Sequence, residues 1–257
     1  INEDILNFFF NMGPILEDFF SFIKDIQRSH EFIPEIIHCS YLPYANLIYS
    51  LFFSKKFNIP CVVTPFLHLE NQRYQNSEIF TVLSKFTKII ACTNYEKKML
   101  INNGIVPEKI HILPMGVDFE KFQKNRREQV KNIYKIDSPV VLFCGYKNFE
   151  KGAITLLKSI PKTSKKFDKL SYVFIGPPTS AFNYTLKNIR KKVENVNIIN
   201  LTPDNLRGIF DYKKIGLFQL ADVYCMPSRS EAYGIAYLEA WATKTPVIAS
   251  NRSEERR

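Results

Sequence analysis

Short apolar runs alternate with amphipathic stretches along almost the whole chain, and this alternation constrains the fold more than any other feature. Runs typical of buried strands cover residues 36–39, 61–64, 89–92, 111–113, 140–144, 172–175, 196–199, 223–226 and 247–249. Stretches typical of helices cover residues 44–57, 76–85, 94–103, 153–160, 181–192, 204–211 and 234–242. Because continuous apolar strands need helices on both faces of their sheet, the sequence predicts an α/β fold with parallel sheets.

The alternation breaks once, around residues 118–137, where the chain is strongly charged and no strand is predicted. The charge balance changes at the same place: residues 1–118 carry 10 Lys/Arg and 12 Asp/Glu, whereas residues 119–257 carry 25 and 13. We therefore expect two Rossmann-like domains, 1–118 and 119–257. Ligands of such sheets bind at the carboxyl ends of the strands, so two facing domains would enclose a cleft.

The formal net charge of +10 lies in the second half of the chain and indicates an anionic partner there. Phosphorylated small molecules, an acidic membrane surface and nucleic acid all fit, as does a basic face that only aids solubility. Nucleic acid is disfavoured because the aromatic residues follow the strand and helix patterns instead of interleaving with Lys and Arg.

The five cysteines are dispersed, and no pair has the spacing of metal ligands. Buried free thiols in a reducing cytoplasm explain them best, and the four histidines give no metal-site spacing either. The Phe-rich segment 5–23 is interrupted by Pro14 and by charged residues, which favours an amphipathic helix packed on a core over a membrane span. The chain begins at Ile and stops soon after a predicted strand, so we expect an interior part of a longer protein, with both domains incomplete.

Two glutamates, Glu231 and Glu239, lie eight positions apart on either side of a predicted strand-to-helix junction. Gly234 and Ile235 would open the helix, where unpaired backbone N–H groups and the helix dipole favour a phosphate. The two carboxylates can then face one cleft and accept hydrogen bonds from hydroxyl groups. The plainer alternative is an ordinary pair of helix glutamates.

The string Pro-Ser-Arg-Ser-Glu-Ala-Tyr-Gly-Ile-Ala-Tyr-Leu-Glu-Ala that contains this pair resembles the E-x7-E signature of retaining glycosyltransferases of the group 1, or family 4, type. That family has the GT-B architecture of two facing Rossmann-like domains. Further similarity lies in residues 141–152, which end in Glu-Lys-Gly, and in the string Pro-Met-Gly-Val-Asp, which resembles the family's interdomain Pro-Asn-Gly-Val-Asp. Residues 36–39 and 61–68 resemble two strand ends of the acceptor domain.

The resemblance implies a role for each candidate residue. Gly145, Lys151, Gly234 and Ile235 would bind the diphosphate of a nucleotide-sugar donor, and Glu239 its ribose. Glu231 would orient the sugar, and His68 would lie near the sugar being transferred. His38 is a weaker candidate at another strand end. No D-x-D-like motif is present, so we expect no metal ion and no cofactor.

The chain departs from the family pattern at several positions. Tyr146 stands where the family often has arginine, and Lys147 is a hypothetical substitute for it. Ala232 and Met115 replace a frequent glycine and asparagine. The family's glycine-rich loop after its first strand is absent, which leads us to expect an incomplete enzyme.

The predicted function is transfer of a sugar from a nucleotide diphosphate sugar to an acceptor hydroxyl, with retention of anomeric configuration. The acceptor would be a saccharide or a lipid-linked molecule, in the cytoplasm or at the membrane periphery. Two alternatives stay open. One is a sugar-nucleotide epimerase or a phosphorylase of the same architecture. The other is a non-enzymatic basic protein that binds membranes or nucleic acid.

Overall fold

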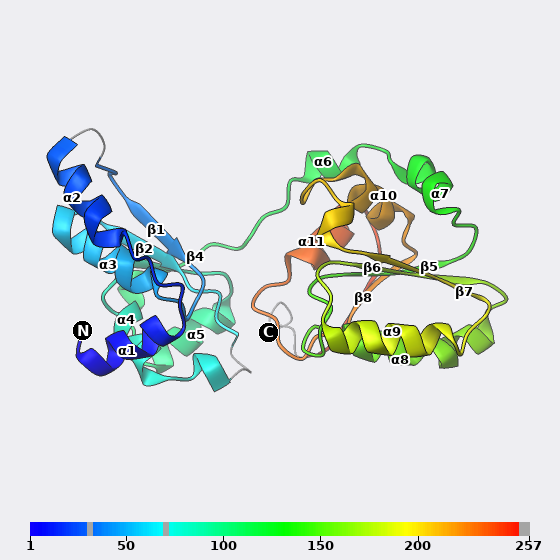
Figure 1. The fold of residues 1–257 in the computed structure, drawn as a ribbon, viewed down its shortest axis with the longest axis horizontal. Coiled ribbons are helices and arrows are strands. Elements are labelled where there is room, and N and C mark those ends of the chain that lie inside the picture. The colour runs from blue at the N-terminus through cyan, green and yellow to red at the C-terminus, as the bar shows by residue number, and fades with distance from the viewer. Residues whose placement is uncertain (30–32, 69–71, 252–257) are drawn as a thin grey trace. The chain divides into compact units, whose positions relative to one another are not determined.

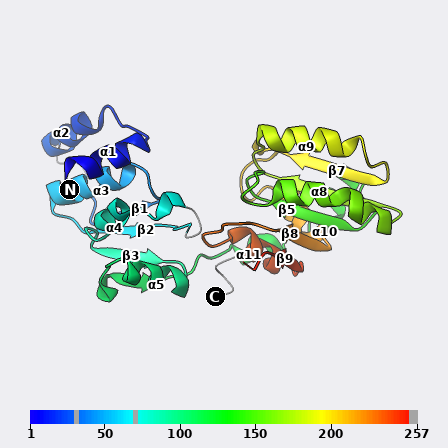
Figure 2. The ribbon, with the colours of Figure 1, turned by 90° about the horizontal axis from the view of Figure 1, so that it is seen from below.

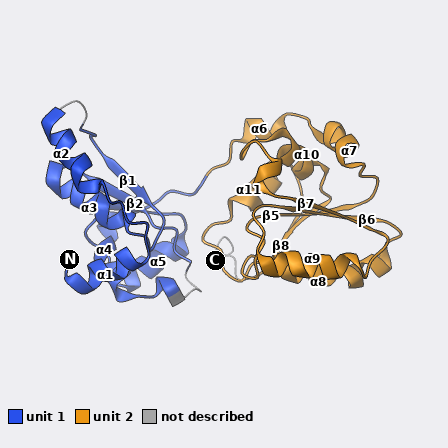
Figure 3. Cartoon of the chain, in the orientation of Figure 1, with its two compact units in different colours: residues 1–115, 257 blue, residues 116–256 orange. Residues whose placement is uncertain are grey.

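The chain divides into two compact units, which Figure 3 shows in different colours. The computed structural model describes residues 1–29, 33–68 and 72–251. Unit 1 runs from Ile1 to Met115, and unit 2 begins at Gly116. The sequence predicts this boundary slightly later, between residues 118 and 119.

Unit 1 contains a parallel sheet in the strand order β1-β2-β3-β4. The strands are β1 (Ile37–Ser40), β2 (Cys61–Thr64), β3 (Lys88–Ala91) and β4 (Ile110–Ile112). Val63, Ile89 and Ala91 are fully buried, because the central strands are covered on both faces. Each strand lies within one residue of its predicted position.

The helices of unit 1 are α1 (Glu3–Asn11), α2 (Phe19–Ser29), α3 (Asn46–Phe57), α4 (Ser77–Leu83) and α5 (Asn94–Asn102). One amphipathic helix was expected near the N-terminus, and two are found. Gly13, at φ +58°, and Pro14 end the first of them. Phe9 of α1 and Ile23 of α2 are buried, so both helices pack on the core.

Unit 2 contains a second parallel sheet, in the order β7-β6-β5-β8-β9. Its strands are β5 (Val140–Cys144), β6 (Leu170–Ile175), β7 (Val196–Leu201), β8 (Val223–Met226) and β9 (Val247–Ala249). The chain builds outward from β5 to β7 and then returns to place β8 on the other side of β5. The strand order therefore reverses between β5 and β8, which is the position where doubly wound sheets bind their ligands.

The helices of unit 2 cover both faces of this sheet. They are α6 (Phe119–Gln123), α7 (Arg127–Tyr134), α8 (Ala153–Thr163), α9 (Ser180–Arg190), α10 (Tyr212–Leu220) and α11 (Ile235–Ala242). Helices α8 and α9 lie side by side on one face in both views (Figures 1 and 2), and α10 and α11 lie on the other. The predicted α/β class with two parallel sheets is thus confirmed.

The prediction of a helix over residues 204–211 is wrong. A short 3-10 helix (Pro203–Asn205) and turns occupy this segment, and the α-helix begins only after Asp211. The Asp211 carboxylate accepts from the N–H groups of Lys213 and Arg207, both at 2.7 Å. Asp211 is therefore an N-cap, which fixes the start of α10 beyond the predicted segment.

Candidate functional site

The candidate donor residues lie at the carboxyl ends of β5 and β8, where the strand order reverses. Gly145 directly follows β5, and its N–H donates to Ile175 O at the end of β6 (2.9 Å). The Tyr224 hydroxyl of β8 donates to Cys144 O (2.8 Å) and holds the ends of β5 and β8 together. The loops that leave these two strands carry Lys151 and Glu231.

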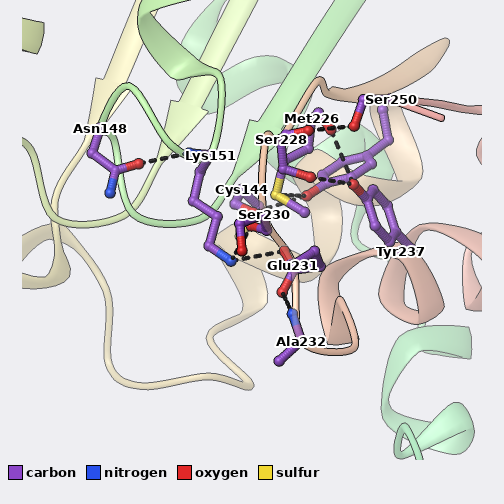
Figure 4. A network of polar contacts seen from close by, with 11 residues as sticks. Cys144, Asn148, Lys151, Met226, Ser228, Ser230, Glu231, Ala232, Tyr237 and Ser250 are labelled. Carbon is purple, nitrogen blue, oxygen red and sulfur yellow. Dashed lines mark hydrogen bonds and ion pairs between the residues drawn. The ribbon is translucent and has the colours of Figure 1, made fainter. Parts of the chain in front are cut away.

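Lys151 and Glu231 form an ion pair, with 2.9 Å between Nζ and Oε2 (Figure 4). Their side chains are only 18% and 10% exposed, so the pair is mostly shielded from water. Lys151 N–H donates to Asn148 Oδ1 (2.7 Å), and Ala232 N–H donates to Glu231 Oε1 (3.2 Å). Both partners are thus fixed by local hydrogen bonds as well as by each other.

Gly152 explains how the two loops approach so closely. Its φ is +79°, and a Cβ at this position would lie 2.2 Å from Pro227 O in the loop after β8. Only glycine fits both this conformation and this contact. The absence of a side chain at residue 152 therefore lets the segment that carries Lys151 pack against the segment that carries Glu231.

Helix α11 begins directly after Gly234, which adopts the left-handed conformation at φ +89°. The Tyr237 hydroxyl donates to Met226 O (3.0 Å) and lies 3.3 Å from Ser228 Oγ. These contacts hold the first turn of α11 against the end of β8. Ile235 is at the first helical position, where backbone N–H groups lack partners within the helix.

Glu239, two turns into α11, pairs with Lys214 of α10, and Nζ lies 2.5 Å from Oε1. Both side chains are about one-tenth exposed. Burial raises the pKa of Glu239, while the charge and hydrogen bond of Lys214 lower it. Lys214 was not singled out from the sequence, because its partner is 25 positions away on another helix.

The two carboxylates belong to one electrostatic environment. Burial raises the pKa of Tyr224, and Cys144, Tyr237, Glu231 and Glu239 raise it further through their charges. The structure thus brings together six candidates of unit 2: Gly145, Lys151, Glu231, Gly234, Ile235 and Glu239.

Lys147 is not placed to replace the family's arginine. It is fully buried, and its Nζ donates to Asn200 Oδ1 (2.5 Å) and to Leu201 O (2.8 Å) at the end of β7. Burial lowers the pKa of Lys147 to about 8. Its ammonium group ties the loop after β5 to the end of β7, with β6 between these two strands, so the hypothesis that it contacts a diphosphate is not supported.

The two histidine candidates lie in unit 1. His68 follows β2, is half-buried, and its ring centroid is 5.4 Å from that of Tyr74. His38 of β1 lies with Nε2 2.8 Å from Thr64 Oγ1 of β2. This bond between neighbouring strands gives His38 a structural partner.

Other expectations concern metals, thiols and membranes. Within the described part of the chain, no three His, Cys, Asp or Glu side chains gather in a way that would hold a metal ion. All five cysteines are free and buried, as expected. None of the described helices has the length and apolar character needed to cross a bilayer.

Comparison with known proteins places both units in glycosyltransferase families. The model for "Glycosyl transferases group 1" matches residues 124–256, and that for "Glycosyltransferase Family 4" matches residues 3–121. The D-inositol 3-phosphate glycosyltransferase of Paenarthrobacter aurescens is 27% identical over 64% of this chain. An uncharacterized glycosyltransferase of Methanocaldococcus jannaschii is 29% identical over 69% of it. The chain spans only 40% and 43% of the lengths of these two relatives.

Solved structures share the fold at low sequence identity. Anabaena HepE, crystallised with UDP and glucose, superposes with a TM-score of 0.69 at 15% identity, over 95% of this chain and 67% of its own. An E. coli trehalose-6-phosphate protein, bound with UDP-2-fluoro glucose, gives a TM-score of 0.69 at 11% identity, over 99% of this chain and 72% of its own. The expected GT-B fold is confirmed. With a family model that covers more than half of its residues, the chain belongs to the group 1 glycosyl transferases.

Proposed function

We propose that this chain supplies donor-binding residues in unit 2 and acceptor-side residues in unit 1 of a glycosyltransferase. The enzyme transfers a sugar from a nucleotide diphosphate sugar to an acceptor hydroxyl, with retention of anomeric configuration. The observation that carries the proposal is the shielded Lys151–Glu231 pair at the start of α11, because it sets a cation and a hydrogen-bond acceptor side by side at a phosphate-binding position.

Lys151 and the first turn of α11 bind the donor diphosphate. Negative charge builds on this group as the bond between the sugar's anomeric carbon and the diphosphate oxygen breaks. A fixed ammonium group and oriented N–H groups stabilise that charge, which contributes several kcal/mol to catalysis in comparable sites. Gly145, which has no side chain, leaves room for the diphosphate at the end of β5. We expect that these groups suffice without a metal ion.

The two carboxylates bind the hydroxylated parts of the donor. When the diphosphate draws Lys151 away, Glu231 becomes free to accept hydrogen bonds from the sugar hydroxyls. Glu239 accepts from the ribose hydroxyls, and the charge and hydrogen bond of Lys214 favour its ionised form against the effect of burial. One donor thus engages both glutamates of the E-x7-E pair.

His68 acts on the acceptor side. The acceptor oxygen forms the new bond to the anomeric carbon as the diphosphate leaves, and the acceptor proton passes to a nearby base. We assign His68 next to the reacting sugar, in agreement with the family resemblance. Front-face attack and a covalent intermediate both give retention.

The relatives support the choice of donor class. HepE was solved with UDP and glucose, and the E. coli protein with a UDP-2-fluoro sugar. UDP-glucose is therefore the first donor to test. The P. aurescens relative suggests D-inositol 3-phosphate as the first acceptor.

The test uses the full-length protein and a panel of UDP, GDP and ADP sugars. A donor stabilises the folded state in proportion to its affinity, so a rise in Tm identifies it. Labelled donor is then incubated with D-inositol 3-phosphate or with a lipid extract, and NMR of the product gives the anomeric configuration. A glycoside with the donor's configuration supports the proposal. Release of an epimer or a sugar phosphate favours the alternative enzymes, and the lack of any Tm shift contradicts the proposal.

Membrane association is a separate part of the proposal. The basic charge of unit 2 suits an anionic surface, where a lipid-linked acceptor would reside. Sedimentation with phosphatidylglycerol vesicles, but not with phosphatidylcholine vesicles, is the expected result. Equal sedimentation with both, or with neither, contradicts it.

A further inference from the structure

Glu96 is a buried carboxylate in unit 1 to which the proposed reaction assigns no role. It is 1% exposed and is the third residue of α5. The sequence Thr93-Asn-Tyr-Glu96 has the form of a capping box, and Thr93 Oγ1 does accept from Glu96 N–H (3.0 Å). In the usual capping box the glutamate carboxylate returns to the N–H of the cap residue.

In this chain the Glu96 carboxylate accepts hydrogen bonds from two other N–H groups instead. Oε1 accepts from Leu67 N–H, 29 residues earlier in the chain, at 3.0 Å. Oε2 accepts from Cys92 N–H at 2.7 Å. Leu67 follows β2, and Cys92 directly follows β3. One side chain therefore joins the segments that leave two neighbouring strands.

The segment after β2 has a conformation that needs support. Phe66 has φ +53°, a left-handed conformation that bulky residues rarely adopt. Its ring stacks on Tyr41, which follows β1, also has a positive φ of +68°, and lies 5.2 Å away between centroids. Such conformations persist only where the surroundings fix them, and they concentrate at functional sites. The Glu96 hydrogen bond holds the residue directly after Phe66, and the next residue is His68.

We propose that Glu96 is a positioning residue that fixes the His68 segment by accepting hydrogen bonds from both Leu67 and Cys92. The role rests on the proposed function, in which His68 lies next to the reacting sugar.

The carboxyl group of Glu96 offers one oxygen to each of the two donors. A glutamine offers one accepting oxygen, and its NH2 group would face the second N–H. Burial raises the pKa of Glu96 to about 7, and the two backbone hydrogen bonds act in the opposite direction. The side chain is thus kept in a costly environment where it makes two specific bonds, which favours a role beyond helix capping.

The test compares Glu96→Gln with Thr93→Ala in the full-length protein. Thr93→Ala removes the other half of the same capping motif but keeps the carboxylate, so it controls for loss of helix stability. Hydrogen exchange measured by mass spectrometry over residues 61–68 reports the Leu67 bond without any substrate. We expect faster exchange there in Glu96→Gln and little change in Thr93→Ala.

Turnover supplies the second readout, as UDP released from UDP-glucose. We expect kcat to fall tenfold or more in Glu96→Gln, with the KM for UDP-glucose changed less than threefold, because donor binding belongs to unit 2. Thr93→Ala should keep kcat within threefold of the wild type.

Two results overturn the proposal: unchanged exchange over residues 61–68 in Glu96→Gln, or a kcat no lower than that of Thr93→Ala. The parallel variant His68→Ala separates this proposal from the proposed function. Full turnover in His68→Ala refutes the role of His68, whereas reduced turnover in His68→Ala with normal turnover in Glu96→Gln refutes only the role of Glu96.

Discussion

The Lys151 ammonium and the Glu231 carboxylate, 80 residues apart in the chain, lie 2.9 Å apart and neutralise each other at the start of α11. In the proposed reaction, binding of a diphosphate would replace one anionic partner of Lys151 with another and release the first. After transfer, the returning Glu231 would compete with the nucleoside diphosphate for Lys151. The pair would therefore assist product release as well as donor binding.

Single substitutions in this pair should have different kinetic effects. Lys151→Ala removes the cation and should weaken donor binding about tenfold or more, which corresponds to ~1.4 kcal/mol. Glu231→Gln should lower kcat about 100-fold with a smaller change in donor affinity, because its hydrogen bonds matter most as the sugar reacts. Calorimetric titration with UDP-glucose and steady-state kinetics measure the two effects.

The matched controls are Lys158→Ala on the exposed side of α8 and Glu194→Gln, also exposed. Neither should change binding or turnover. Since Lys151 and Glu231 touch, the double variant should lose less than the sum of the single losses. Wild-type turnover in Glu231→Gln would contradict the role given to this carboxylate.

Removal of Lys214 should destabilise unit 2 in a pH-dependent way. Lys214→Met leaves the buried Glu239 without its cation, a change that typically costs about 3–5 kcal/mol. The pKa of Glu239, already raised by burial, should rise further. An acid with a raised folded-state pKa loses its stabilising contribution as pH increases, so the defect should be larger at pH 8 than at pH 5. Urea denaturation at both pH values tests this.

Lys213→Met is the control for Lys214→Met, because the neighbouring Lys213 Nζ contacts only the exposed Asn205 O, at 3.3 Å, among the described residues. It should change stability by less than about 0.5 kcal/mol, as surface substitutions usually do. A defect of equal size in both variants, or one independent of pH, would be incompatible with the buried pair.

Gly152→Ala should damage both stability and donor binding. The left-handed conformation costs about 1–3 kcal/mol for a non-glycine residue, and the new Cβ would meet Pro227 O at 2.2 Å. Gly208→Ala is the control: Gly208 also has positive φ, at +97°, but no atom of the described residues outside its immediate neighbours would lie within 4 Å of a Cβ there. We expect Gly152→Ala to lower Tm more than Gly208→Ala does. We also expect Gly152→Ala to weaken UDP-glucose binding and Gly208→Ala to leave it unchanged. Equal effects would show that packing against Pro227 is unimportant.

Glu96 should give unit 1 a characteristic pH dependence. Its pKa rises from 4.5 to about 7 on folding, mainly through burial. The contribution of Glu96 to stability is therefore complete below pH 4.5 and declines as pH increases towards 7, by up to about 1.4 kcal/mol per pH unit. Glu96→Gln lacks this decline. Tm measured from pH 4.5 to 8 should fall more steeply in the wild type, and parallel curves would exclude a raised pKa.

The strand pattern could be predicted from the sequence because each strand is a local apolar run. Strands β2, β5, β8 and β9 begin and end at their predicted residues. The first residues of the helices were harder to predict, because they depend on side chains that cap the free N–H groups of the first turn. Asp211 reads as the end of a polar helix in the sequence, yet its carboxylate caps the next one.

The candidate site was predictable where motifs are continuous in sequence, as in the segment from Glu231 to Glu239. The partners of the buried charged side chains could not be predicted from the sequence. Lys214 lies outside the predicted helices, and Glu96 looks like an ordinary helix residue. Only the folded chain brings Lys214 to Glu239 and Glu96 to Leu67. Lys147 shows the opposite error, since a lysine beside a phosphate motif reads as a ligand but is buried at the end of β7.

The reversal of strand order in unit 2 has a consequence for how the molecule reaches its native state. On one side β5 pairs with the next strand to be synthesised, but its other neighbour, β8, arrives about 80 residues later. Such long-range pairing is slow, because a large loop must close first. A nucleotide sugar that contacts both loops would bind only after this closure. It should therefore slow unfolding of unit 2.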